Sequence, residues 1–529
     1  MSILDAILIA VKYTFYLLAP WGLSILIYRF AFHPLRKYPG PFLAKLTDGY
    51  AGFYAMRRRP HLNTYQNIQK YGSVYREGPN RIIFSSLAAI QDIYFNPNIA
   101  KGRAYHQARS GNPTNLFNTP DNDEHRRKRK VIGQVVSDRS LRSFSPIMSK
   151  QIDIFLQQLL RSSQRGEFVN LTPLCRNLSM DIAFYLSFGY ALNTQTDPTN
   201  RFIHGSMGQA LYMSNLNFNW PALTIAGPLL QWLGKKKVEG FRQFIRKMIV
   251  SRMAEPRDAK SDFYSVVAGD VAEVDGIHES ELWGEALFFV TAGGTTVATA
   301  ACGVFFHLSQ HPDAYARLAA GIRGTFSSGR DIVSGPTLAS CKYLRAVVDE
   351  SLRLAPPSLA PLWRELEASA TEPLVVDGHV IPRGTEVGIH LYSVLHDPDN
   401  YPEPFAFRPE RWLVPEDGGA PDSPESRDAR ARMRRAQVSF GLGDRGCAGK
   451  AMAYMETSVT LARALWYFDF EMAPGEAGKL GIGREGSNDP WAGPDQFQLD
   501  DILVADHDGP NVVFKPRREY WRELMAEKV

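Results

Sequence analysis

The segment Ser439–Leu465, SFGLGDRGCAGKAMAYMETSVTLARAL, carries the most specific pattern in this 529-residue chain. Five of its residues stand at the spacing F-x-x-G-x-R-x-C-x-G, namely Phe440, Gly443, Arg445, Cys447 and Gly449. Average composition predicts this pattern by chance on the order of 10⁻⁴ times in such a chain. Glycines allow a tight turn and close approach to a flat ligand, and a cysteine at a helix N-terminus is favoured as a thiolate. The segment therefore indicates a ligand-binding loop, in which an isolated core cysteine is the less favoured interpretation.

Helical periodicity dominates the rest of the chain. Helices are expected at Ser149–Ser163, Thr172–Phe188, Val238–Met253, Glu279–Gln310, Asp313–Thr325, Thr337–Leu354 and Ala448–Tyr467. Strands are expected at Val74–Arg76, Arg81–Phe84, Leu374–Val376, Val387–Ile389 and Val512–Lys515. The Pro-, Gly-, Ser- and Asp-rich run Glu416–Ser426 is expected to be a surface insertion. The sequence thus predicts a mainly α protein with a small β portion, and no linker divides residues 49–529 into separate domains.

Composition excludes several classes of protein. Apolar residues make up 44% of the chain, which is enough for a large core. The formal net charge is only +5, and no zinc-finger spacing or nucleic-acid motif is present, so nucleic acid is not an expected partner. The four cysteines show no close pairing in the sequence, which is typical of free thiols in a reducing compartment.

The N-terminus predicts a membrane anchor. The run Ala6–Tyr28 is apolar apart from Lys12 and a few small or hydroxyl residues, and about 20 apolar residues cross a bilayer. Basic residues follow from Arg29 onward, which places the C-terminal side in the cytosol. A cleaved signal peptide is the rival interpretation. Residues 1–30 are taken as the anchor and residues 31–48, with several prolines, as a stiff extended connector.

Two further patterns are ambiguous on their own. His125 and Arg129 lie in DEHRRKRK, which read alone is a basic surface helix. The run Ala292-Gly293-Gly294-Thr295-Thr296 lies inside a long apolar helix, where each glycine costs about 1 kcal/mol relative to alanine. The glycines indicate either a packing notch between helices or a local distortion beside a ligand.

Charged residues near the middle of the chain add a third pattern. Glu350 and Arg353 are three residues apart, so they share a helix face and can pair, as many exposed helix residues do. Arg364 follows PPSLAPLW, and Arg411 lies in FRPERW downstream.

Taken together, these motifs resemble the cytochrome P-450 family over nearly the whole chain. The resemblance implies the cytochrome P-450 fold after one transmembrane helix, and haem b as cofactor with Cys447 as the axial ligand to its iron. It implies that Arg445, His125, Arg129 and Arg364 hold the haem propionates, and that Glu350, Arg353 and Arg411 form a structural network. It further implies that Ala292, Gly293 and Thr296 lie over the haem face where oxygen binds.

One position departs from the family pattern. The family has Asp or Glu before the threonine that corresponds to Thr296, whereas this chain has Thr295. A threonine supplies no carboxylate, so the source of protons is in question, and Thr295 and Thr296 are taken together as the catalytic pair.

The resemblance implies a monooxygenase that oxidises a lipophilic small molecule, as in fungal secondary-metabolite biosynthesis. Electrons from NADPH are expected through a separate NADPH–cytochrome P-450 reductase in the endoplasmic-reticulum membrane, because no flavin or NADPH fingerprint is present. Two alternatives stay open: a haem-thiolate enzyme that rearranges, dehydrates or couples its substrate without net oxygen insertion, and a non-enzymatic haem-binding protein.

Overall fold

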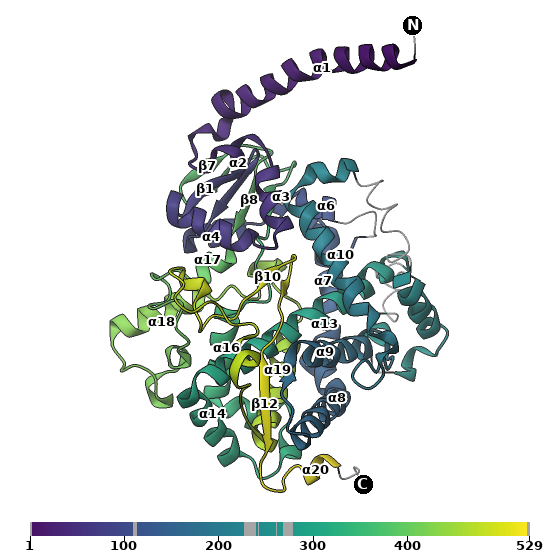
Figure 1. The fold of residues 1–529 in the computed structure, drawn as a ribbon, viewed down its shortest axis with the longest axis vertical. Helices are drawn as coiled ribbons and strands as arrows, with labels where there is room; N and C mark the ends of the chain where they lie inside the picture. The colour runs from purple at the N-terminus through teal and green to yellow at the C-terminus, as the bar shows by residue number, and fades with distance from the viewer. Residues whose placement is uncertain are drawn as a thin grey trace.

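The computed structural model describes residues 3–108, 114–226, 240–241, 243–260, 262–267 and 279–525. Helices dominate these residues, and the strands form small sheets, which confirms the predicted fold class (Figure 1).

The α-helices and β-strands have the following bounds. The α-helices are α1 (Ile3–Ile27), α2 (Phe42–Leu46), α3 (Gly49–Met56), α4 (Pro60–Tyr71), α5 (Leu87–Tyr94), α6 (Ala104–Ala108), α7 (Asn122–Val135), α8 (Asp138–Gln164), α9 (Leu171–Phe188), α10 (Phe202–Asn219), α12 (Phe263–Val267), α13 (Glu279–Gln310), α14 (Pro312–Thr325), α15 (Pro336–Ser340), α16 (Lys342–Leu354), α17 (Leu391–Leu395), α18 (Pro424–Ala436), α19 (Lys450–Tyr467) and α20 (Arg522–Met525). The strands are β1 (Val74–Gly78), β2 (Arg81–Phe84), β3 (Ile99–Lys101), β4 (Val169–Asn170), β5 (Arg364–Leu366), β6 (Leu374–Val376), β7 (His379–Ile381), β8 (Glu386–Ile389), β9 (Phe468–Met472), β10 (Asp500–Asp501), β11 (Ala505–Asp506) and β12 (Asn511–Pro516).

Most predicted elements are confirmed, with corrections at their ends. The helix expected over Thr337–Leu354 is two helices, because the chain leaves helical geometry at Cys341 (φ −73°, ψ 75°). The helix expected from Ser149 begins eleven residues earlier at Asp138, where the Ser137 hydroxyl accepts a hydrogen bond from the Ser140 amide. Of the helix expected over Val238–Met253, residues 243–253 are helical, and 238, 239 and 242 lie outside the described residues.

The main sheet brings distant segments together. Its strand order is β1-β2-β8-β5-β3, with β8 parallel to β2 and the other neighbours antiparallel. At its edge Lys101 of β3 pairs with Arg364 of β5, which places two cations side by side. A second sheet of order β4-β12-β9 and two hairpins, β6–β7 and β10–β11, complete the β portion.

The core is organised around α13. This helix packs against α9, α16 and α19, and Figure 1 shows it crossing the middle of the molecule. Its residues Ala298, Cys302, Val304 and Phe305 are almost fully buried in the largest apolar cluster. The cysteine loop is the turn from Phe440 to Gly449, and α19 follows it directly. Packing of α19 against α13 therefore fixes this loop relative to α13.

The N-terminal helix projects away from the rest of the molecule (Figure 1). By length and composition, two helical stretches among the described residues could cross a membrane, Lys12–Phe32 and Gly284–Gln310. The second is the core helix α13, more than half buried, whereas the first has none of its surface buried. Lys12–Phe32 is therefore the candidate anchor.

The prolines predict an extended connector after the anchor, but the connector is not extended throughout. It contains a π-helical turn η1 (Tyr28–Phe32), a 3-10 turn η2 (Pro34–Lys37) and α2. Its residues Leu35 and Tyr38 are buried, and the Arg76 amide of β1 donates to the Pro39 carbonyl at 2.8 Å. The segment is thus part of the folded body, because its apolar side chains have a sheet to pack against.

Candidate functional site

The cysteine loop is a tight turn held against α5. Gly441 and Gly443 have φ of +62° and +68°, a region that side chains rarely adopt. A side chain at Gly443 would collide with the Tyr94 carbonyl at the end of α5. The Cys447 amide donates to the Phe440 carbonyl at 2.7 Å, and α19 begins three residues after the cysteine. The glycine spacing of the motif is therefore required by this backbone path.

The Cys447 thiol is accessible and yet desolvated. It is the exposed cysteine among the four, but burial is the main influence on it and raises its thiol pKa. Its sulfur is therefore free to bind a ligand in a poorly hydrated environment. The amide of Gly449 and the charges of Arg129 and Lys450 act in the opposite direction, as the sequence predicts, but burial outweighs them. A bound metal ion would deprotonate such a thiol outright.

Phe440 and Gly449 complete the surroundings of the sulfur. The Phe440 ring packs on Tyr454 of α19, with ring centroids 5.1 Å apart. Gly449 has open space on the side where a Cβ would stand. Room beside Gly449 is what a flat ligand lying over the loop requires.

A cluster of basic side chains lies near the loop. Arg445 donates to the carbonyls of Thr119 and Pro120, which precede α7, at 3.0 and 3.1 Å. His125 and Arg129 are one turn apart on α7, and Arg129 donates to the Gly446 carbonyl at 2.7 Å. Arg364 of β5 donates to the Tyr105 hydroxyl at 3.2 Å. The structure thus brings together the four residues that sequence resemblance assigned to the propionates.

A fifth cation, Lys101, was missed by sequence analysis. It is buried beside Arg364 in the β3–β5 pair, its ammonium donates to the Leu116 carbonyl at 2.6 Å, and it lies over the Tyr105 ring. No motif marks it, because its place depends on strand pairing across more than 250 residues of chain. Only a β-strand prediction for Ile99–Lys101 together with one for Arg364–Leu366 could have indicated it.

These five basic groups disfavour one another's charged forms, and His125 is neutral at pH 7. Burial, followed by the charges of Lys101, Arg445, Arg129 and Arg364, lowers the pKa of His125 to about 2. Burial and the charge of Arg364 lower the pKa of Arg445 to about 10, and burial followed by Arg445 lowers that of Lys101 well below its usual value. Within the described part of the chain, none of the five forms an ion pair. The cluster therefore fits an anionic ligand of more than one charge, such as the two propionates of haem.

The glycines of α13 serve helix packing. A Cβ at Gly293 would lie 3.3 Å from Ala183, and one at Gly294 would lie 2.8 Å from the Met180 methyl, both on α9. The structure therefore favours the packing notch over a local distortion beside a ligand. The helix α13 is continuous from Glu279 to Gln310 and shows no break at these glycines.

The threonines of α13 bond back to their own helix. The hydroxyls of Thr296 and Thr295 donate to the carbonyls of Ala292 and Thr291, at 2.6 and 2.8 Å. Both threonines are only partly buried, so their hydroxyl oxygens remain able to accept a bond from a ligand or water.

Glu350 is the centre of a buried ionic network. Its two oxygens accept from Arg353 at 2.9 Å each, from Arg411 at 3.0 Å and from the Trp412 indole at 2.9 Å. Burial alone raises the pKa of Glu350, but Arg353 and Arg411 outweigh it, and the pKa falls to about 2. The network joins α16 to the 3-10 turn η7 (Pro409–Trp412).

A desolvated thiol on a glycine turn, near basic side chains that form no ion pair among the described residues, is the arrangement that a haem-thiolate protein requires. Comparison with known families agrees. The Cytochrome P450 family model matches residues 39–483, and the chain belongs to this family.

Several of its curated relatives are fungal proteins. The cytochrome P450 monooxygenase AKT7 of Alternaria alternata is 32% identical over segments that cover 93% of this chain and 95% of that protein. The cytochrome P450 monooxygenase poxM of Penicillium oxalicum is also 32% identical, with 86% and 88% covered. The cytochrome P450 monooxygenase apf7 of Gibberella fujikuroi is 31% identical, with 93% and 96% covered. The protein is a cytochrome P450 monooxygenase, and its family implies a haem-thiolate cofactor, a redox partner and a small-molecule substrate.

Proposed function

We propose that this monooxygenase holds haem b between the Cys447 loop and α13, and oxidises a lipophilic small molecule of fungal secondary metabolism. The observation that carries the haem placement is the accessible but desolvated Cys447 thiol near five basic side chains, none of which forms an ion pair within the described residues. When bound, haem supplies the reductive activation of O₂, and a thiolate ligand favours cleavage of the O–O bond.

Each residue of the site has a defined task. Cys447 binds the iron, and its loop amides hold the sulfur in place. Arg445, Arg364 and Arg129 would orient and neutralise the propionates, the neutral His125 would donate an N–H hydrogen bond to them, and Phe440 and Gly449 would border the macrocycle. Thr295 and Thr296 position oxygen-bound water through their hydroxyls. Glu350, Arg353 and Arg411 stabilise the fold around the site.

The substrate class rests on two observations. The curated relatives are monooxygenases of filamentous fungi, a group in which such enzymes commonly tailor terpenoids, polyketides and alkaloids. The candidate anchor would hold the enzyme at a membrane, where lipophilic substrates concentrate. Residues 1–30 then act as anchor, 31–48 as a folded connector and 49–529 as one catalytic domain facing the cytosol from the endoplasmic reticulum.

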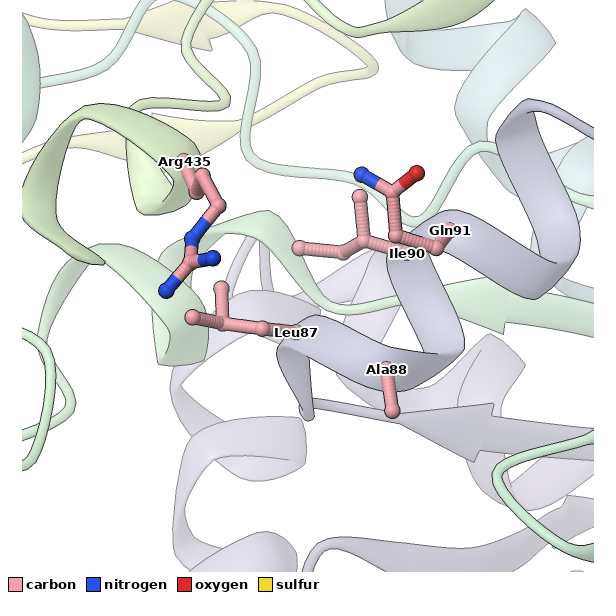
Figure 2. A pocket seen from close by; sticks show the side chains of 5 residues that line it. All are labelled: Leu87, Ala88, Ile90, Gln91 and Arg435. Atoms are coloured by element: carbon pink, nitrogen blue, oxygen red, sulfur yellow. The ribbon is translucent and has the colours of Figure 1, made fainter. Parts of the chain in front are cut away.

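A separate NADPH–cytochrome P450 reductase is the proposed electron donor. Figure 2 shows a hollow between α5 and the end of α18, lined by Leu87, Ala88, Ile90, Gln91 and Arg435. The Arg435 side chain extends toward the apolar Leu87, and α5 also contacts the cysteine loop. A cationic, partly apolar surface close to the thiol suits an acidic donor protein.

Reconstitution tests the proposal. The full-length protein in lipid vesicles, with reductase and NADPH, is offered a panel of fungal terpenoids and polyketides under ¹⁸O₂. We expect at least one product that contains one ¹⁸O atom and requires reductase. Products that form without reductase or without label incorporation would instead support rearrangement or coupling, which the missing acid at Thr295 keeps open.

A further inference from the structure

The absence of a carboxylate at position 295 raises the question of where protons come from. Monooxygenation consumes one O₂, two electrons and two protons, and yields an oxygenated product and one water. The redox partner supplies the electrons, and solvent must supply both protons through the protein. Thr295 and Thr296 can pass a proton on but have no acidity of their own.

A buried carboxyl belongs to the β10–β11 hairpin, which contacts α13 near Thr299. Asp501 of β10 is 1% exposed, and its Oδ1 accepts from the Leu503 amide at 3.0 Å, whereas its Oδ2 has no hydrogen-bond partner among the residues that the structure describes. The nearest basic atom is Nδ1 of His61, at 3.9 Å, and this atom is also buried without a partner. Two such atoms facing each other beyond direct hydrogen-bond distance call for a bridging water.

Strand pairing connects this carboxyl to the threonines. Asp501 pairs with Ala505 across the β10–β11 hairpin, and α13 packs against β11. The Ala505 carbonyl accepts from the Thr299 hydroxyl at 3.2 Å, and the same hydroxyl lies 3.3 Å from the Thr295 carbonyl. Thr291, Thr295 and Thr299 are spaced four apart, so their hydroxyls form a polar line along one side of α13.

A way in from solvent lies on the other side of His61. A cleft lined by Arg59, His61, Gln496 and Gln498, among others, has a volume of about 10 Å³, which is room for about one water. Arg59 at its mouth is 40% exposed. The cleft thus borders His61, His61 faces Asp501, and the Asp501–Ala505 strand pair contacts Thr299 of α13.

We propose that Asp501, recharged through His61, is the proton donor for oxygen activation, and that Thr299 and Thr295 mark the route along α13. The carboxyl O–H bond breaks, its proton passes to a neighbouring water, and that water passes a proton toward Thr296. The carboxylate then regains a proton from solvent through His61. The inference rests on the proposed haem placement on the Thr296 side of α13.

The charges around Asp501 suit this role. Burial, with a smaller contribution from neighbouring Asp500, raises the pKa of Asp501 to about 7. Burial, followed by the charges of His390, Arg59 and His396, lowers the pKa of His61 well below its usual value, so His61 is neutral at pH 7. Asp500 itself is paired with Arg58 and Arg59. A donor must be protonated, so proton delivery is expected to fall as pH rises through about 7.

Infrared titration of the ferric holoenzyme tests the carboxyl directly. A protonated-carboxyl C=O band that exchanges in D₂O and disappears with a midpoint near pH 7 should be missing in Asp501→Asn. The variant assigns the band, because the pKa values of Glu77 and Glu456 are also raised to about 7. Asp500→Asn removes the neighbouring charge, so the band should remain with a lower midpoint.

Reductase-driven NADPH oxidation, without added substrate, tests the route. Electrons then leave as hydrogen peroxide, which takes two electrons and two protons per O₂, or as two waters, which take four of each. Cleavage of the O–O bond to water needs a proton delivered inside the site, so the share of water reports on that delivery. Asp501→Asn and Thr299→Val should each lower the yield of water about tenfold or more, since a positioned acid contributes roughly 100-fold or more. Asp506→Asn, a substitution on the same hairpin, should leave the yield of water unchanged. Thr295→Asp should restore water formation in the Asp501→Asn protein.

The outcomes separate the two proposals. Each variant is first examined for its carbon-monoxide difference spectrum, and a thiolate-type band shows that the haem site is intact. With that band present, an unchanged water yield in both Asp501→Asn and Thr299→Val, or no infrared band lost in Asp501→Asn, overturns the proton route. Absence of the thiolate-type band from the wild type overturns the haem placement instead.

Discussion

Glu350→Gln tests the buried ionic network that supports the site. The substitution keeps the shape of the side chain, but it removes the negative charge between Arg353 and Arg411 and turns one oxygen into a donor. The carboxylate accepts from both arginines, from the Trp412 indole and from the Arg408 amide. The amide of glutamine would face these donors with donors of its own.

The magnitude follows from the pKa. Glu350 is fully buried, and its pKa falls from 4.5 to about 2 in the folded protein. At about 1.4 kcal/mol per pH unit, this difference corresponds to about 3 kcal/mol of folding free energy. Loss of one partner from a buried ion pair typically costs about 3–5 kcal/mol, which agrees. We expect Glu350→Gln to destabilise the protein by about 3 kcal/mol at pH 7.

The pH dependence gives the sign. Because folding lowers this pKa, the contribution is fully present above pH 4.5 and is lost as pH falls from 4.5 toward 2. Urea unfolding of full-length protein in detergent, followed by tryptophan fluorescence, should therefore show a difference between wild type and variant that narrows below pH 4.5. The control is Glu410→Gln, a half-exposed partner of Arg317, for which we expect less than about 1 kcal/mol. A Glu350→Gln protein as stable as Glu410→Gln would refute the reasoning.

Three further changes have defined outcomes. Gly443→Ala should lower the ratio of haem to protein, because its φ of +68° and the Tyr94 carbonyl leave no room for a methyl group, whereas Gly133→Ala in the open on α7 should leave that ratio unchanged. Lys101→Met should speed haem loss to apomyoglobin roughly tenfold or more, as expected for a hydrogen bond to a charged group worth about 1.5 kcal/mol or more; an unchanged rate would remove Lys101 from the site. Deletion of residues 1–30 should release the protein from carbonate-washed membranes, and continued sedimentation with them would contradict the anchor assignment.

The sequence could predict what depends on local spacing. The cysteine loop, helix α13 and the Glu350–Arg353 pair lie within short windows, where periodicity and glycine positions determine geometry directly. Helix α18 was missed because Pro424 and the Ser- and Asp-rich run before it are typical of loops. In the structure these residues start the helix, since Ser423 and Ser426 cap its first turn reciprocally.

Features built by long-range pairing could not be predicted. Lys101 joins the cationic cluster only because β3 pairs with β5, and Asp501 approaches α13 only because β10 pairs with β11. Neither short strand has a recognisable alternation, so sequence analysis had no basis for placing these side chains. The buried partners of such strands become visible only when the fold is known.

The carbon-monoxide difference spectrum of the dithionite-reduced protein tests the central claim most directly. We predict a thiolate-type Soret band for the wild type and its absence from Cys447→Ala, with Cys341→Ala, a partly buried cysteine near α16, as the matched control that retains it. A thiolate-type band that persists in Cys447→Ala, or haem-replete wild-type protein that lacks one, would contradict the assignment of Cys447 as the iron ligand.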